Sequence, residues 1–230
     1  MGMTKKERYQ ALIAYFSEHQ PNPETELQYT NPYELLVAVI LSAQCTDKRV
    51  NMVTPHLFSR YPSPRSLAAA EPEEVFEYIR SISYPNNKAK HLVGMARLLV
   101  DEFNEEVPDT VADLTRMPGV GRKTANVIVS VIHDQPAMAV DTHVFRTSHR
   151  LGLVSKKCTT PLAVEKELMK SFPKEIIPKA HHWLILHGRY TCLARNPQCQ
   201  QCALTDYCKS FPAIQKWGIK KVDEALPSIN

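Results

Sequence analysis

Apolar residues recur at helical spacing along almost the whole chain. The i, i+3, i+4, i+7 pattern is followed by Tyr9, Leu12, Ile13 and Phe16, and later by Leu92, Ala96, Leu99 and Phe103. No segment alternates convincingly with period two, and prolines and glycines interrupt the helical pattern repeatedly. The pattern therefore predicts an all-α protein whose helices, about 8 to 16 residues long, are joined by short turns.

The composition narrows the class of protein further. With 230 residues, of which 43% are hydrophobic, the chain can bury one large core or two small ones. The longest apolar run, Leu35 to Leu41, is far shorter than the roughly 20 residues that span a membrane, and Met1 to Arg8 lacks the apolar block of a signal peptide. We expect no contact with a membrane. The net charge of +4 is compatible with a polyanionic partner but is too small to predict one.

Two of only seven glycines, Gly119 and Gly121, lie two positions apart. The segment around them predicts two helices, over residues 111–117 and 122–133, joined by a tight turn. Glycines allow a ligand to approach the backbone closely, and the amides of such a turn and of the following helix start can bind a phosphate. The structural alternative is an ordinary hairpin of two helices.

Arg122 and Lys123 place two cations in the first turn of the second helix, where the helix dipole disfavours them. The same dipole and the neighbouring guanidinium favour the neutral amine that a nucleophilic lysine must be. Two solvated or phosphate-binding cations explain the segment more simply when it is considered alone.

Asp141 begins a predicted helix that ends at Gly152. Aspartate is a favoured N-cap, so a purely structural role explains this residue when it is taken alone. His143 and the other histidines of this half of the chain are expected to be packing or surface residues, because their spacing forms no metal site.

Four cysteines follow the spacing C-x6-C-x2-C-x5-C, namely Cys192, Cys199, Cys202 and Cys208. In a reducing compartment such a group indicates a metal rather than disulfides. Four thiolates suit either a tetrahedral zinc ion or an iron–sulfur cluster. Zinc sites usually combine two C-x2-C pairs and this segment has one, so the spacing favours the cluster. Cys45 and Cys158 are isolated and are interpreted as small buried hydrophobic residues.

Together these motifs resemble the endonuclease III family of helix-hairpin-helix DNA glycosylases, from about Tyr9 to Cys208. The resemblance is carried by residues 41–47 (LSAQCTD), 117–126 (MPGVGRKTAN), 140–144 (VDTHV), 187–189 (HGR) and the four cysteines. It implies two helical domains with a DNA-binding cleft between them. One is a six-helix domain with the helix-hairpin-helix motif, over residues 25–135. Residues 1–24 and 136–212 would form the iron–sulfur cluster domain, and residues 213–230, which lack a clear apolar face, a loosely held C-terminal tail.

The implied activity is that of a bifunctional DNA glycosylase and AP lyase of base excision repair. Lys123 would attack the sugar C1′ of an oxidised pyrimidine that is flipped out of the duplex, expel the base and form a Schiff base, after which β-elimination nicks the strand. Asp141 would activate the lysine and stabilise positive charge on the sugar. The four cysteines would hold a structural 4Fe-4S cluster. The implied partner is double-stranded DNA with oxidised pyrimidines or abasic sites, bound by a monomer in the bacterial cytoplasm, at the nucleoid.

The resemblance also implies which residues contact DNA: Gly119, Val120, Gly121, Arg122, His143 and Arg195. Gln44 and Tyr84 would fill the hole left by the flipped nucleotide. Two departures stand out. Arg195 is the one basic residue of the loop between the first two cysteines, where family members often have more, and Tyr84 replaces a leucine that wedges into the duplex.

Two alternatives remain at this stage. Adenine-mismatch glycosylases lack the lysine and carry a glutamate where this chain has apolar residues 37–39, and thymine-mismatch glycosylases have a tyrosine at the position of Lys123. The other alternative is a non-catalytic DNA-binding module with a structural zinc. Strand cleavage on abasic DNA would separate this module from the enzymes.

Overall fold

The structure, a computed structural model, describes residues 3–228, and these form helices and turns with no strand among them. The predicted all-α class is therefore confirmed. The chain divides into two compact units, Thr25–Asp134 and, from both ends of the chain, Met1–Glu24 with Gln135–Asn230. The predicted cluster domain and C-terminal tail also include residues 1–2 and 229–230, which lie outside the described part.

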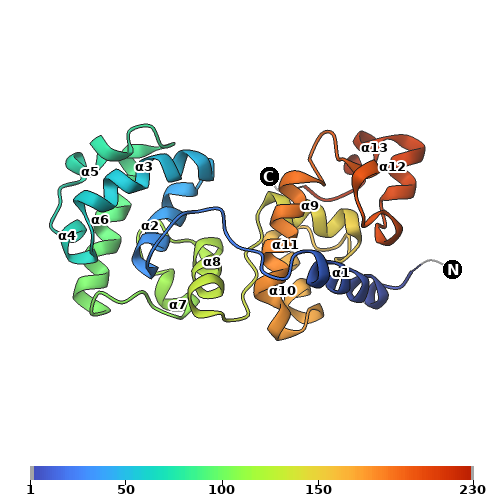
Figure 1. Ribbon diagram of the computed structural model, residues 1–230, viewed down its shortest axis with the longest axis horizontal. Coiled ribbons are helices and arrows are strands. Elements are labelled where there is room, and N and C mark those ends of the chain that lie inside the picture. The colour runs from blue at the N-terminus through green and yellow to red at the C-terminus, as the bar shows by residue number, and fades with distance from the viewer. Residues whose placement is uncertain (1–2, 229–230) are drawn as a thin grey trace. The chain divides into compact units, whose positions relative to one another are not determined.

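Seven helical segments make up the unit of residues 25–134 (Figure 1): α2 (Pro32–Ser42), α3 (Asp47–Arg60), α4 (Pro64–Ala68), α5 (Pro72–Ile79), α6 (Pro85–Glu102), α7 (Val111–Leu114) and α8 (Arg122–His133). We expected six helices; two of the seven segments are very short, α4 with five residues and α7 with four. Side-chain caps from Asn31, Thr46, Ser63 and Thr110 start four of these helices. Proline occupies the first turn of α2, α4, α5 and α6, where its missing amide costs no hydrogen bond.

Helix α2 is the centre of this unit. All residues from Leu35 to Leu41 are buried, so the helix is apolar on every side. Helices α3, α6 and α8 pack against it. The apolar run noted in the sequence is thus a core helix. Because α3, α6 and α8 pack against it, α2 positions the ends of these three helices.

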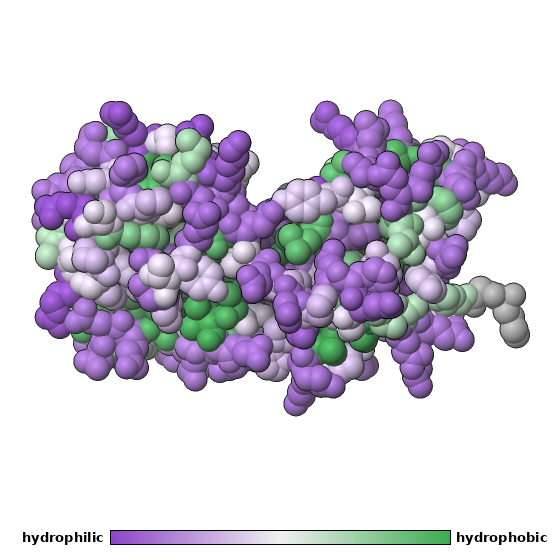
Figure 2. Space-filling model, in the orientation of Figure 1, coloured by the Kyte–Doolittle hydropathy of each residue, from purple (hydrophilic) through white to green (hydrophobic). Residues whose placement is uncertain are grey.

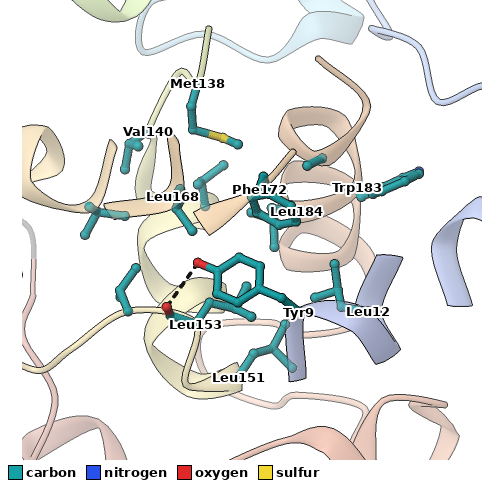
Figure 3. Close-up of a cluster of buried hydrophobic side chains, with 14 of the residues drawn as sticks. Tyr9, Leu12, Met138, Val140, Leu151, Leu153, Leu168, Phe172, Trp183 and Leu184 are labelled. Carbon is teal, nitrogen blue, oxygen red and sulfur yellow. Dashed lines mark hydrogen bonds between the residues drawn. The ribbon is translucent and has the colours of Figure 1, made fainter. Parts of the chain in front are cut away.

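The other unit joins the first helix of the chain to the last ones: α1 (Lys5–His19), α9 (Thr142–Leu151), α10 (Pro161–Ser171), η1 (Lys174–Ile176), α11 (Ile177–Tyr190), η2 (Cys199–Gln201), η3 (Thr205–Tyr207), α12 (Phe211–Trp217) and α13 (Ile219–Glu224). Figure 1 shows α1 beside α10 and α11. Tyr9 and Leu12 of α1 belong to one core with Leu168 and Trp183 (Figure 3), and the Tyr9 hydroxyl donates a hydrogen bond to the Leu153 carbonyl at 3.1 Å.

The C-terminal segment differs from the loosely held tail that we expected. It forms α12 and α13, Val222 is buried, and Asp223 makes an ion pair with Arg150. The expectation was wrong because it looked for an apolar face, whereas a polar contact to a distant residue anchors α13.

None of the described helices is both long and apolar enough to cross a bilayer. In the view of Figure 2 hydrophilic residues cover most of each unit, and apolar residues form small, separate patches.

Candidate functional site

A hairpin of two helices joined by a tight turn is present as predicted; α8 has the expected bounds 122–133, whereas α7 ends at Leu114 and not at residue 117. Gly119 has a φ of +80°, and a Cβ there would lie 2.9 Å from the Cβ of His91, so the turn needs glycine for both conformation and space. Gly121 is the N-cap of α8, without a side-chain cap, and a Cβ on it would meet nothing within 4 Å. The space beside Gly121 is therefore open, as a bound phosphate requires.

Lys123 and Arg122 are both exposed in the first turn of α8. Val120 differs from the other residues of this turn that were predicted to contact DNA. Its side chain is buried, and its amide donates to the Met117 carbonyl at 3.1 Å. A phosphate at this turn would be bound by the helix start rather than by Val120.

Asp141 is the N-cap of α9, and its Oδ1 accepts a hydrogen bond from the Val144 amide at 2.8 Å. The helix ends at Gly152 in the left-handed conformation, as predicted. The half-buried His143 approaches Arg146 with 3.2 Å between Nδ1 and Nη2. It packs closely on α11, where a Cβ on Gly188 would lie 2.8 Å from that of His143.

The structure brings together the two turns that carry Gln44 and Tyr84. Both residues are exposed and have positive φ, 55° and 57°, which is uncommon for residues other than glycine. The Ser83 hydroxyl donates to the Gln44 carbonyl at 2.8 Å and so joins the turns directly.

Lys88 is a residue of this site that sequence reasoning missed. It is buried in the first turns of α6, and its Nζ donates to the carbonyls of Leu41 at 2.8 Å and Ala43 at 2.6 Å, at the end of α2. Burial lowers the pKa of this lysine. The signal was present in the sequence, because Lys88, like Lys123, is a cation near a helix N-terminus, where the dipole disfavours it.

The four cysteines lie around the short helices η2 and η3 and are all half-buried. Burial, with a smaller contribution from the charge of Cys192, raises the pKa of Cys199 and Cys202 and raises that of Cys208 to about 11. The thiols are thus close enough to interact, and ionising them together requires a cationic group. Within residues 3–228 no three His, Cys, Asp or Glu side chains are placed to hold a single metal ion.

Arg195 is exposed on the loop between the first two cysteines. Cys45 and Cys158, interpreted as buried hydrophobic residues, are only half-buried.

Comparisons with known proteins assign the class. The sequence model of the HhH-GPD superfamily of base excision DNA repair proteins matches residues 37–174, and that of the iron–sulfur binding domain of endonuclease III matches residues 192–208. The chain is thus a base excision DNA repair protein of the HhH-GPD superfamily.

Individual relatives narrow the class to one family. The chain is 47% identical to endonuclease III of Rickettsia conorii, over 87% of this chain and 94% of the relative. It is 42% identical to that of Escherichia coli K12, over 90% and 97%. A structure described as a trapped endonuclease III–DNA covalent intermediate matches with a TM-score of 0.86 and 44% identity, over 93% of this chain and all of that one. The chain belongs to the endonuclease III family.

Family membership confirms the activity implied by the motifs. The protein is a DNA N-glycosylase with AP lyase activity in base excision repair, and DNA is its partner. The cysteine segment binds a 4Fe-4S cluster, as its spacing favoured over zinc.

Proposed function

We propose that the protein removes oxidised pyrimidines from duplex DNA and nicks the resulting abasic strand, with Lys123 as the nucleophile. The observation that carries the proposal is the exposed Lys123 in the first turn of α8, next to the open space at Gly121. Phosphates of the damaged strand bind at this helix start, assisted by its dipole and by Arg122.

The chemistry follows from an amine at that position. The Lys123 Nζ forms a bond to C1′ while the base leaves with the electron pair of the glycosidic bond and takes up a proton. The C1′–O4′ bond of the sugar then breaks as the nitrogen forms a double bond to C1′, and O4′ takes up a proton, which gives the Schiff base. Loss of a C2′ proton then expels the 3′ phosphate, and hydrolysis releases the lysine. Asp141 activates the lysine and stabilises positive charge on the sugar.

Gln44 and Tyr84 fill the space that the flipped nucleotide leaves. The Gln44 amide forms hydrogen bonds with the orphaned base, and the Tyr84 ring stacks on the neighbouring bases. Their exposure and the link between their turns support this role. Arg195 adds a phosphate contact, and His143 lies beside the α9 start that carries Asp141. The protein acts as a monomer at the nucleoid of a bacterial cytoplasm.

Borohydride trapping on abasic duplexes tests the nucleophile. Wild type should form a covalent adduct, and Lys123→Gln should form none. Arg122→Gln is the matched control, because it removes the neighbouring cation and should weaken DNA binding while still trapping. Trapping of Lys123→Gln at the wild-type rate would assign the reaction to another amine.

A panel of lesion duplexes, scored separately for base release and nicking, tests the substrate class. Oxidised pyrimidines should be released faster than mismatched adenine or thymine, and the reverse order would contradict the proposal. A fluorescent base analogue opposite the lesion tests Gln44→Ala and Tyr84→Ala. Both should slow base extrusion on intact lesions more than cleavage of abasic DNA. Sedimentation of the free protein tests the monomer.

A further inference from the structure

Arg150 connects both ends of the cysteine segment to α9. Its side chain is fully buried and donates from Nη1 to the Leu193 carbonyl at 2.6 Å and to Cys192 Sγ at 3.5 Å, and from Nη2 to the Ala194 carbonyl at 2.8 Å. The Cys208 thiol lies 3.4 Å from the Arg150 carbonyl. One residue thus contacts the first and the last cysteine of the cluster segment.

The charge of this buried guanidinium is balanced from the C-terminal helix. Asp223 of α13 accepts from Arg150 Nε at 3.0 Å and from Nη2 at 2.5 Å, a bidentate pair. Such a pair orients the guanidinium as well as neutralising it. Without Asp223, the charge of Arg150 would remain buried with carbonyl and sulfur contacts alone, which is unfavourable.

The loop after Cys192 borders an open pocket. This pocket, of about 490 Å³, is lined by loop residues and by residues of α12 and α13, among them Phe211, Ile214 and Ile219. The matched iron–sulfur domain ends at residue 208, so Asp223 lies outside it.

We propose that Asp223 is a positioning residue that, through Arg150, holds the loop from Cys192 to Cys199 and keeps Cys192 in place as a cluster ligand. This positioning of the loop has two consequences. The cluster is retained longer, and Arg195 is presented to DNA with less loss of conformational freedom. The second consequence rests on the proposed DNA contact of Arg195, whereas the first rests only on the cluster segment.

Asp223→Asn tests the inference, because it keeps the size of the side chain and removes its charge. Glu224→Gln is the matched control, since Glu224 is the exposed neighbour on the same helix. In the iron-loaded full chain, Asp223→Asn should release iron to a chelator at least about fivefold faster, measured by visible absorbance and released iron. Its KM for abasic duplex should rise several-fold with kcat unchanged. Glu224→Gln should behave as wild type, and Asp223→Glu should restore most of both properties.

Far-UV circular dichroism checks that Asp223→Asn keeps its helical content. Iron release at the wild-type rate would overturn the positioning role. Faster release with an unchanged KM would overturn only the part that involves Arg195. The inference would also be overturned if Glu224→Gln changed iron release and KM as much as Asp223→Asn does, or if Asp223→Glu restored neither. Either result would indicate a nonspecific effect of charge.

Discussion

Asp141 combines a structural position with a proposed chemical one. Its Oδ1 caps α9 by accepting from the Val144 amide at 2.8 Å. Asn caps helices about as well as Asp, so Asp141→Asn should change the free energy of unfolding by less than about 0.5 kcal/mol. The same change removes the charge that stabilises the sugar cation and should lower excision by about 10²-fold or more. Urea unfolding and single-turnover base release measure the two effects, and near-normal excision would limit Asp141 to capping.

Gly119 and Gly121 offer a matched pair of substitutions in one turn. Gly119→Ala places a Cβ at a φ of +80° and 2.9 Å from His91, and should destabilise the protein by about 1–3 kcal/mol. Gly121→Ala meets nothing within 4 Å and should stay within about 1 kcal/mol of wild type.

The added methyl group at residue 121 should nevertheless weaken binding of abasic duplex, because it enters the space assigned to a phosphate. Unfolding curves and DNA titrations measure the two quantities. If Gly121→Ala bound DNA as tightly as wild type, the phosphate would have to bind elsewhere than at this turn.

At the scale of elements, Lys88 ties the end of α2 to the start of α6. Lys88→Met keeps the aliphatic stem but leaves the carbonyls of Leu41 and Ala43 without this donor, so the protein should lose about 1.5–3 kcal/mol of stability. Lys90→Met, at an exposed position of α6, is the control and should have little effect. Denaturant unfolding measures both.

The same substitution should loosen the two turns that carry Gln44 and Tyr84. Lys88→Met should therefore slow base extrusion, followed with a fluorescent base opposite the lesion, relative to Lys90→Met. If stability and base extrusion were unchanged in Lys88→Met, the carbonyls of Leu41 and Ala43 would be hydrogen-bonded to water in place of the lysine.

The sequence predicted those elements whose signals are local. The bounds of α8 and the glycine that ends α9 follow from turn chemistry and periodicity within a few residues. The cysteine spacing favoured the iron–sulfur cluster that the matched domain over residues 192–208 shows, and the four cysteines stay predictions as its ligands. Lys88 and Asp223 were missed because their partners are distant in sequence, 47 residues away for Leu41 and 73 for Arg150. Periodicity carries no information on such contacts, which depend on how helices pack.

At the scale of the whole molecule, the two units have separate cores, and the cluster belongs to one of them. All four cysteines lie in the unit of residues 3–24 and 135–228, and Leu204, between two of them, is 1% exposed in its core. The cluster segment itself contains only the short 3₁₀ helices η2 and η3, which cannot persist without support.

Removing iron with a chelator should therefore unfold residues 192–208 and expose the core beneath Leu204. Hydrogen exchange followed by mass spectrometry should show protection lost in residues 192–228 and reduced in α1, whose residues share that core. Protection in α2 and α8 should remain, because the unit of residues 25–134 keeps its own apolar centre. Equal loss in both units would mean that they unfold as one cooperative body, and full protection everywhere would mean that the segment folds without the cluster.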